Sequence, residues 1–235
     1  MESVCLLFLT PFLFVAVSTA QTKPAQPSAR TDVYHVHITT AAPGKAIQLA
    51  EFLKTPDTKA AMPGHFLVLR HQYGDSWDYV VIQHLGSKAM VEAAGDPPPA
   101  AARDASAMHT DTFVNGPAWP DVVRALGLGE QSSKTRGSVY VVSVYRAAPG
   151  HRDELEKELS SPPGTGETVA GSVLFQHLEG GAWNYLNVVR YNSWQDLATN
   201  ENAGMADLQK NQGGWFRLRD HAGFHTDTLT DRIAP

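Results

Sequence analysis

An internal repeat constrains the fold of this chain more than any other feature of its sequence. Segment 33–44, which begins with Val-Tyr and ends with Ala-Ala-Pro-Gly, recurs as segment 139–150. The tetrapeptide His-Thr-Asp-Thr at 109–112 recurs at 225–228, at a slightly larger spacing. Four single landmarks lie between these segments and recur in the same order: His71 as His177, Gly74 as Gly180, Trp77 as Trp183 and Tyr79 as Tyr185. An ordered series of this kind indicates two tandem copies of one structural unit.

Each copy shows the same succession of hydrophobic periods. Val33–Thr40 alternates between apolar and polar residues, as a half-buried strand does, and Pro-Gly then ends it. Lys45–Lys54 carries apolar residues at helical spacing. Two strands joined by a Gly-containing turn follow, at His65–Gln72 and Trp77–Leu85. With a second helical region and a closing strand at His109–Val114, the order is βαββαβ, the ferredoxin-like split βαβ arrangement.

The repeat and its flanks divide the chain into five parts. We predict an α+β fold in which two ferredoxin-like units pack sheet to sheet, because each unit leaves one sheet face in need of a partner. The predicted parts are a signal peptide (1–20), a flexible spacer (21–30), unit 1 (31–115), a linker with a short helix at 121–128 (116–137) and unit 2 (138–235).

The first 20 residues have the composition of an export signal. Leu6–Val17 is an apolar run too short for a comfortable membrane span, and small residues precede a cleavage point after Ala20. Glu2 stands where a basic residue is usual, so an uncleaved anchor or an internal strand stays open as the alternative. We expect export to a periplasm or to the exterior, with no stable membrane span after signal removal. Cleavage would also remove Cys5, the only cysteine, leaving no thiol for disulfides or thiolate metal sites.

The charge balance argues against a nucleic-acid partner. The chain has 19 Lys and Arg against 24 Asp and Glu, a net charge of −5. Proteins that bind nucleic acids usually carry a basic patch or stripe, and no long run of Lys or Arg is present.

With its repeat order, unit length and Tyr, Trp and His landmarks, the chain resembles the dimeric α/β-barrel superfamily over residues 31–232. In that superfamily two ferredoxin-like units pack their sheets into one barrel, and its members include antibiotic-biosynthesis monooxygenases, haem-degrading monooxygenases, chlorite dismutases and stress-responsive barrel proteins. The resemblance implies a ligand cavity, either between sheet and helices or inside the barrel. It identifies no catalytic residue, because this fold hosts unrelated chemistries.

Strand alternation predicts which side chains line such a cavity. If Tyr34, Val36 and Ile38 pack under the helices, the opposite face of the sheet lines the cavity, and a concave lining with a few polar groups suits a small molecule. The predicted catalytic residues on that face are His35, His37, Arg70 and Tyr79. The predicted ligand-binding residues are Trp77, Gln83, Tyr145, Gln176, Tyr185 and Asn187.

Two histidine motifs offer more specific chemistry. His35 and His37 lie roughly 6.5–7 Å apart on one strand face and could share a metal, with His109, Asp111 or His71 as a third ligand. An isolated His-x-His is a weak signal. We favour the interpretation that the two histidines are simply polar residues on a half-exposed strand, so no metal is assigned.

The repeated His-Thr-Asp-Thr could make a histidine base oriented by Asp, or it could tie down a turn. We favour the second role because the motif occurs in both units, whereas the residues predicted to line the cavity differ between the units.

Three functional hypotheses follow. The first is a small-molecule-binding protein for an apolar or aromatic ligand, with or without cofactor-independent monooxygenase activity. The second is a haem- or metal-dependent enzyme that uses the histidines of unit 1. The third is a non-catalytic module for assembly or partner binding, and self-association is compatible with all three. Whether the protein is an enzyme stays open at this stage, and no cofactor is predicted.

Overall fold

A computed structural model of the chain describes residues 29–55, 64–86, 100–129, 132–164 and 166–235. The predicted signal peptide, most of the spacer and most of the second helical region of unit 1 lie outside the described residues. No helix within the described ranges is long and apolar enough to cross a membrane.

The helices and strands follow the predicted order. The first half of the molecule contains β1 (Arg30–Ala41), α1 (Ala46–Lys54), β2 (Phe66–Tyr73), β3 (Tyr79–Gly86), α3 (Ala100–Arg103) and β4 (Ser106–Pro117). A connecting helix follows, α4 (Trp119–Leu126), which begins two residues before the predicted one. The second half contains β5 (Val139–Ala147), α5 (Arg152–Leu159), β6 (Gly171–Glu179), β7 (Tyr185–Tyr191), α6 (Trp194–Leu208), α7 (Gly214–His221) and β8 (Ala222–Ala234).

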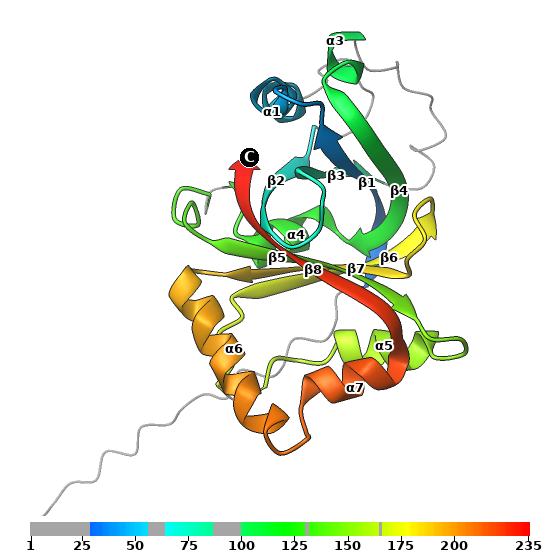
Figure 1. Cartoon of the computed structure of the whole chain (residues 1–235), viewed down its shortest axis with the longest axis vertical. Helices are drawn as coiled ribbons and strands as arrows, with labels where there is room; N and C mark the ends of the chain where they lie inside the picture. The colour runs from blue at the N-terminus through cyan, green and yellow to red at the C-terminus, as the bar shows by residue number, and fades with distance from the viewer. Residues whose placement is uncertain (1–28, 56–63, 87–99, 130–131, 165) are drawn as a thin grey trace, which may run out of the picture.

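The eight strands close into one antiparallel barrel in the order β1-β3-β2-β8-β5-β7-β6-β4. Within this ring the first half contributes β4-β1-β3-β2 and the second half contributes β8-β5-β7-β6, so corresponding strands stand in the same order. The halves join at two seams, β2 with β8 and β4 with β6. Helices α1 and α3 lie on one side of the barrel, and α5, α6 and α7 lie on the opposite side (Figure 1).

The barrel interior is a single apolar core that both halves fill. Its buried side chains come from strands of both halves and from α4: Tyr34, Val36, Leu67, Leu69, Val80, Ile82, Val122, Leu126, Tyr140, Val142, Val173, Phe175, Leu186 and Val188. Smaller clusters outside the barrel join α1 to Tyr79 and α5 to Tyr185. Because one core is shared, neither half has a complete hydrophobic core of its own.

This arrangement reverses the predicted facing of the strands. Tyr34 and Val36 do not pack under the helices; they point into the barrel, and His35 and His37 point outward. The polar set therefore lies on the outer face of the barrel. The more apolar set is inside because a closed barrel excludes water from its interior, where an unpaired polar group is costly.

Helix α4 packs on the barrel and contributes Val122 and Leu126 to the core. Tyr140 donates its hydroxyl hydrogen to the carbonyl of Leu126 at 2.9 Å, and Arg190 donates to the carbonyl of Ala125 at 3.1 Å. At Gly171, at the start of β6, a Cβ atom would lie 1.9 Å from the carbonyl oxygen of Ala125. Only glycine therefore allows α4 to approach β6 this closely.

Candidate functional site

A cluster of three histidines around one carboxylate lies on the outer face of the first half. Strands β1 and β4 are antiparallel neighbours, and their register places Asp111 opposite His37. Oδ1 of Asp111 lies 2.8 Å from Nε2 of His35 and 2.8 Å from Nδ1 of His37. Nε2 of His109 lies 3.4 Å from Oδ2 of the same carboxylate. We call His35, His37, His109 and Asp111 the histidine cluster.

The carboxylate determines which ring nitrogens of the histidine cluster carry protons. An ionised Asp only accepts hydrogen bonds, so His35 donates through Nε2–H and His37 through Nδ1–H. In the neutral rings the other nitrogens, Nδ1 of His35 and Nε2 of His37, then hold lone pairs. The cluster therefore contains a potential general base whose orientation a carboxylate fixes.

Burial and the neighbouring charges set the protonation of these groups. Burial lowers the pKa of His35, which the charge and hydrogen bond of Asp111 only partly offset and the charge of His37 lowers further. For Asp111, burial raises the pKa, but the hydrogen bonds and charges of His37 and His35 outweigh it, so the pKa lies below its ordinary value. At neutral pH, His35 is therefore a neutral imidazole beside an ionised carboxylate. The side chains of both bonded histidines are about a quarter exposed (25% and 23%).

Aromatic and amide groups border the histidine cluster. The ring of Phe113 lies 5.4 Å from that of His35, and the ring of His109 lies 5.2 Å from that of His37. Gln83, opposite His35 on β3, hydrogen-bonds to the His35 ring. The surroundings thus combine an apolar ring with polar groups.

The second half carries only part of this arrangement. Val141 and Ser143 stand at the positions of His35 and His37, and the repeated pair His225 and Asp227 is 3.6 Å apart. The His225 ring stacks on Tyr145, with centroids 6.0 Å apart. The second half therefore lacks the two histidines that converge on the carboxylate in the first half.

The threonines of the repeated tetrapeptide tie down turns, as the structural interpretation of the motif predicts. Buried Thr112 accepts a hydrogen bond from the backbone N–H of Gly181, and buried Thr228 accepts one from that of Asp75. Each threonine therefore fixes a hairpin turn of the other half. The Asp of the first copy does more than this, since it is the centre of the histidine cluster.

The remaining predicted site residues are scattered. Arg70 forms an ion pair with Asp231 across the β2–β8 seam, with 2.8 Å between Nη2 and Oδ2. Tyr79 donates its hydroxyl hydrogen to the carbonyl of Ala46 beneath α1. Trp77 belongs to the barrel core. The structure therefore brings His35, His37 and Gln83 together but separates Arg70, Tyr79 and Trp77 from them.

The predicted ligand-binding residues of the second half lie elsewhere. Ser172 donates its hydroxyl hydrogen to the side-chain oxygen of Asn187 at 2.8 Å. Gln176 and Tyr185 both donate to Oε2 of Glu156, at 3.3 and 2.9 Å.

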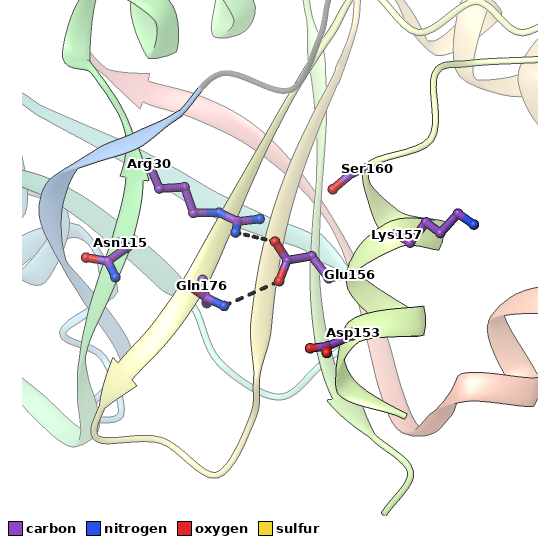
Figure 2. Close-up of a pocket in the computed structure, with 7 residues that line it drawn as sticks. All are labelled: Arg30, Asn115, Asp153, Glu156, Lys157, Ser160 and Gln176. Carbon is purple, nitrogen blue, oxygen red and sulfur yellow. Dashed lines mark hydrogen bonds and ion pairs between the residues drawn. The ribbon is translucent and has the colours of Figure 1, made fainter. Parts of the chain in front are cut away.

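Gln176 lines a polar cleft at the β4–β6 seam, beneath α5 (Figure 2). The cleft has a volume of about 560 Å³ and is lined by Arg30, Asn115, Asp153, Glu156, Lys157, Ser160 and Gln176. Arg30 reaches Glu156 from the start of β1, with 2.5 Å between Nη1 and Oε1. The carboxylate of Glu156 is thus already bonded by Arg30, Gln176 and Tyr185, which leaves it little capacity for a ligand.

Sequence reasoning missed Arg30 and Glu156, and it offered Asp111 to the two strand histidines only as one of three possible third metal ligands. The sequence did contain a signal for the contact between Asp111 and the two strand histidines. In a βαββαβ unit the first and last strands are neighbours, so side chains on β1 and β4 can be expected to meet. Nothing in the sequence marks Glu156, which stands in a charged helix.

The described parts of the chain contain no group of three or more His, Cys, Asp or Glu side chains arranged to hold a metal ion. In the histidine cluster the ring nitrogens are directed at the carboxylate oxygens instead.

Comparisons with known proteins identify the fold. No protein-family model matches the chain, and no curated protein matches it significantly. Among solved structures, an anthrone oxidase-like protein matches with a TM-score of 0.61 and 13% identity, covering 87% of this chain and 92% of that one. Candidate monooxygenases from Lactobacillus acidophilus (TM-score 0.47, 10% identity, 86% of this chain and 94% of that one) and Fusobacterium nucleatum (0.49, 8%, 86% and 93%) also match. The first likeness shows that the chain shares the fold of the anthrone oxidase-like protein.

Proposed function

We propose that this protein is an exported, small-molecule-binding α/β barrel that oxidises an apolar or aromatic substrate without a cofactor. The observation that carries the proposal is the convergence of His35 and His37 on one oxygen of Asp111 at the outer face of the first half. The anthrone oxidase-like protein of the same fold supports an electron-rich aromatic substrate.

The chemistry requires a base, a substrate with an acidic C–H and molecular oxygen. A neutral histidine of the cluster removes a proton from a CH₂ group activated by adjacent aromatic or carbonyl groups, and Asp111 stabilises the imidazolium that forms. The resulting carbanion reduces O₂ and combines with it to give a peroxide anion, which takes the proton back from the histidine and becomes a hydroperoxide. The histidine then removes the second C–H proton, the O–O bond breaks, and the departing hydroxide takes that proton, so CH₂ and O₂ become C=O and H₂O.

The proposal is tested by oxygen consumption with anthrone as the substrate. We expect turnover by the purified protein, and a loss of about 10²-fold or more in His35→Ala and Asp111→Asn, the range that removal of a general base produces. His225→Ala and Asp227→Asn are matched controls because they alter the second copy of the motif, and they should retain turnover. Equal losses in both sets of variants would contradict a base in the first half.

The second candidate is the haem- or metal-dependent enzyme that the sequence suggests, which would use the same histidines although the described residues show no group arranged to hold a metal ion. Elemental analysis and a visible spectrum of the purified protein separate the two candidates. Stoichiometric metal or a Soret band would favour the haem- or metal-dependent enzyme and contradict the cofactor-independent proposal. A protein that turns over no substrate, holds no metal and self-associates would favour the assembly module.

Export is a separate part of the proposal, supported by the apolar run Leu6–Val17 and the small residues that end at Ala20. The intact mass of the protein from the exported fraction of its host should correspond to a chain that begins at Gln21. Recovery of the full-length chain from the cytoplasm would contradict it.

A further inference from the structure

A second hydrogen-bonded chain of titratable groups links Asp32, His84 and His65. Nε2 of His84 lies 2.7 Å from Oδ2 of Asp32, and its other ring nitrogen, Nδ1, lies 3.1 Å from Nδ1 of His65. The backbone N–H of His84 donates to the carbonyl of His65 at 2.9 Å, which holds the two residues side by side. None of these residues belongs to the histidine cluster or was predicted from sequence as a site residue.

The Asp32 carboxylate at one end determines which nitrogens carry protons along this hydrogen-bonded series of side chains. The Asp32 carboxylate also accepts a hydrogen bond from the backbone N–H of Trp119 at 3.2 Å. Burial raises the pKa of Asp32, but its hydrogen bonds and the charge of His84 outweigh that effect and lower the pKa. An ionised Asp32 requires Nε2–H on His84, so Nδ1 of a neutral His84 accepts from Nδ1–H of His65. Nε2 of His65 is then left with a lone pair.

The rings are arranged for this N–H···N bond. The two imidazole planes are tilted by 13° and their centroids are 5.4 Å apart; with the Nδ1 atoms at 3.1 Å, the rings meet edge to edge. The indole of Trp119 lies nearly parallel to both rings, 4.9 Å from His65 and 5.6 Å from His84. His84 is buried whereas His65 is exposed, so the chain runs from a partly buried carboxylate to a histidine at the surface.

We propose that His65 is a nucleophilic histidine that accepts acyl groups from activated esters, with His84 as its base and Asp32 as a positioning residue. The order of nucleophile, base and orienting carboxylate is that of a catalytic triad, with a histidine as the nucleophile. Burial lowers the pKa of His65, and a proton on His84 would lower it further, so this ring is neutral at pH 7.

The proposed step balances within these groups and water. Nε2 of His65 attacks the ester carbonyl, an N–C bond forms, the ester C–O bond breaks and the alcohol oxygen leaves as an anion. The Nδ1 proton of His65 passes to His84, which leaves a neutral acyl-imidazole and an imidazolium beside Asp32. The imidazolium gives its proton to the departing alcohol oxygen. Water then attacks the acyl carbon, and the products are the carboxylic acid, the alcohol and the free histidine.

A second histidine pair in the same molecule provides the comparison. Nδ1 of His151 lies 3.1 Å from Nδ1 of His221, the same separation as in the first pair. Their planes are tilted by 34°, and within the described residues no carboxylate bonds to either ring. The two pairs therefore differ mainly in the presence of Asp32 and Trp119.

The first test uses diethyl pyrocarbonate, which acylates unprotonated imidazoles, on the native protein at pH 7. Mapping of the adducts by mass spectrometry should show His65 modified about 10²-fold faster than His151 or His221, the low end of activation by a base. Equal rates at the three histidines would overturn the proposal, and this comparison needs no variant.

Variants then test the roles of the two other groups. Asp32→Asn should slow the modification of His65 about tenfold and lower the pH at half-maximal rate, because the charge that favours the imidazolium is gone. A purely structural role of Asp32 would leave that pH midpoint unchanged. With p-nitrophenyl acetate, His65→Gln should abolish hydrolysis above the background rate and His221→Ala should retain it. Full hydrolysis by a folded His65→Gln protein would overturn the proposal.

Discussion

Asp111 shows how one side chain can serve both the fold and a site. Its backbone carbonyl lies against the turn at Gly180, where a Cβ atom would be 2.3 Å away, and its carboxylate accepts from two histidines. The structurally equivalent Asp227 has the same contact with Gly74 but no second histidine. A difference of two residues, His35 and His37 against Val141 and Ser143, therefore separates the histidine cluster from its counterpart in the second half.

The titration of His35 is expected to reflect both its burial and the charge of Asp111. Because its folded pKa lies below the ordinary 6.5, His35 contributes stability that is fully present above pH 6.5 and is lost as the pH falls toward the folded pKa. Asp111→Asn should lower the pKa of His35 further, since the carboxylate charge favours the imidazolium. NMR titration of the imidazole resonances measures both values. Asp227→Asn is the control and should leave the titration of His35 unchanged.

At the scale of elements, each half of the barrel is held by a turn of the other. The β6–β7 turn packs on β4, and the β2–β3 turn packs on β8, with buried threonines accepting hydrogen bonds from the turns. The seams between the halves are also joined by ion pairs, Arg70 with Asp231 and Arg30 with Glu156. The first is substantially exposed, and exposed pairs of this kind stabilise by only ~0–1 kcal/mol. Close packing at the turns therefore matters more than these charges.

Substitution of Gly180 by Ala should destabilise the protein by about 1–3 kcal/mol, as overpacking of a tight contact does. Gly180 has a φ of +113°, and its added Cβ would meet the backbone oxygen of Asp111. Gly150→Ala is the matched control, since φ there is also positive (+84°) but no atom lies within 4 Å. Chemical denaturation of both variants separates the contact from the backbone strain, and equal losses of unfolding free energy would show that the contact contributes nothing.

At the scale of the whole molecule, the closed barrel makes the two halves depend on each other. The core side chains of β1, β2 and β3 pack against those of β5, β6 and β7, and all strand edges are paired within the ring. A separated half would expose an apolar sheet face and two unpaired edges, both of which favour association.

Unfolding of the intact protein should accordingly be a single cooperative transition, observed by calorimetry and by circular dichroism at the same temperature. Each half expressed alone (residues 29–129 or 132–235) should be unfolded or should self-associate, as size-exclusion chromatography would show. Two well-separated transitions, or a stable monomeric half, would contradict the shared core.

Acid should destabilise the whole barrel through a few carboxylates. The pKa values of Asp32, Asp111 and Glu156 are all lowered in the folded protein, because hydrogen bonds outweigh the effect of burial. Their contribution to stability is present above their unfolded pKa values of about 4 and is lost as the pH falls through the lower folded values. Denaturation curves between pH 5 and pH 2 should show this loss, and Glu156→Gln should make the curve shallower.

The sequence by itself determined the order of the elements and the identity of the two halves. The repeat from Val33-Tyr34 to His225 and the changes of period predict the strand order, because local periodicity and turn residues depend only on near neighbours. The tertiary structure decided which face of each strand is inside, since alternation sorts Tyr34 from His35 without indicating which one meets water. It also decided which residues meet across strands, as His37 meets Asp111 and His84 meets Asp32. Those contacts depend on register and barrel closure, which join residues far apart in the chain.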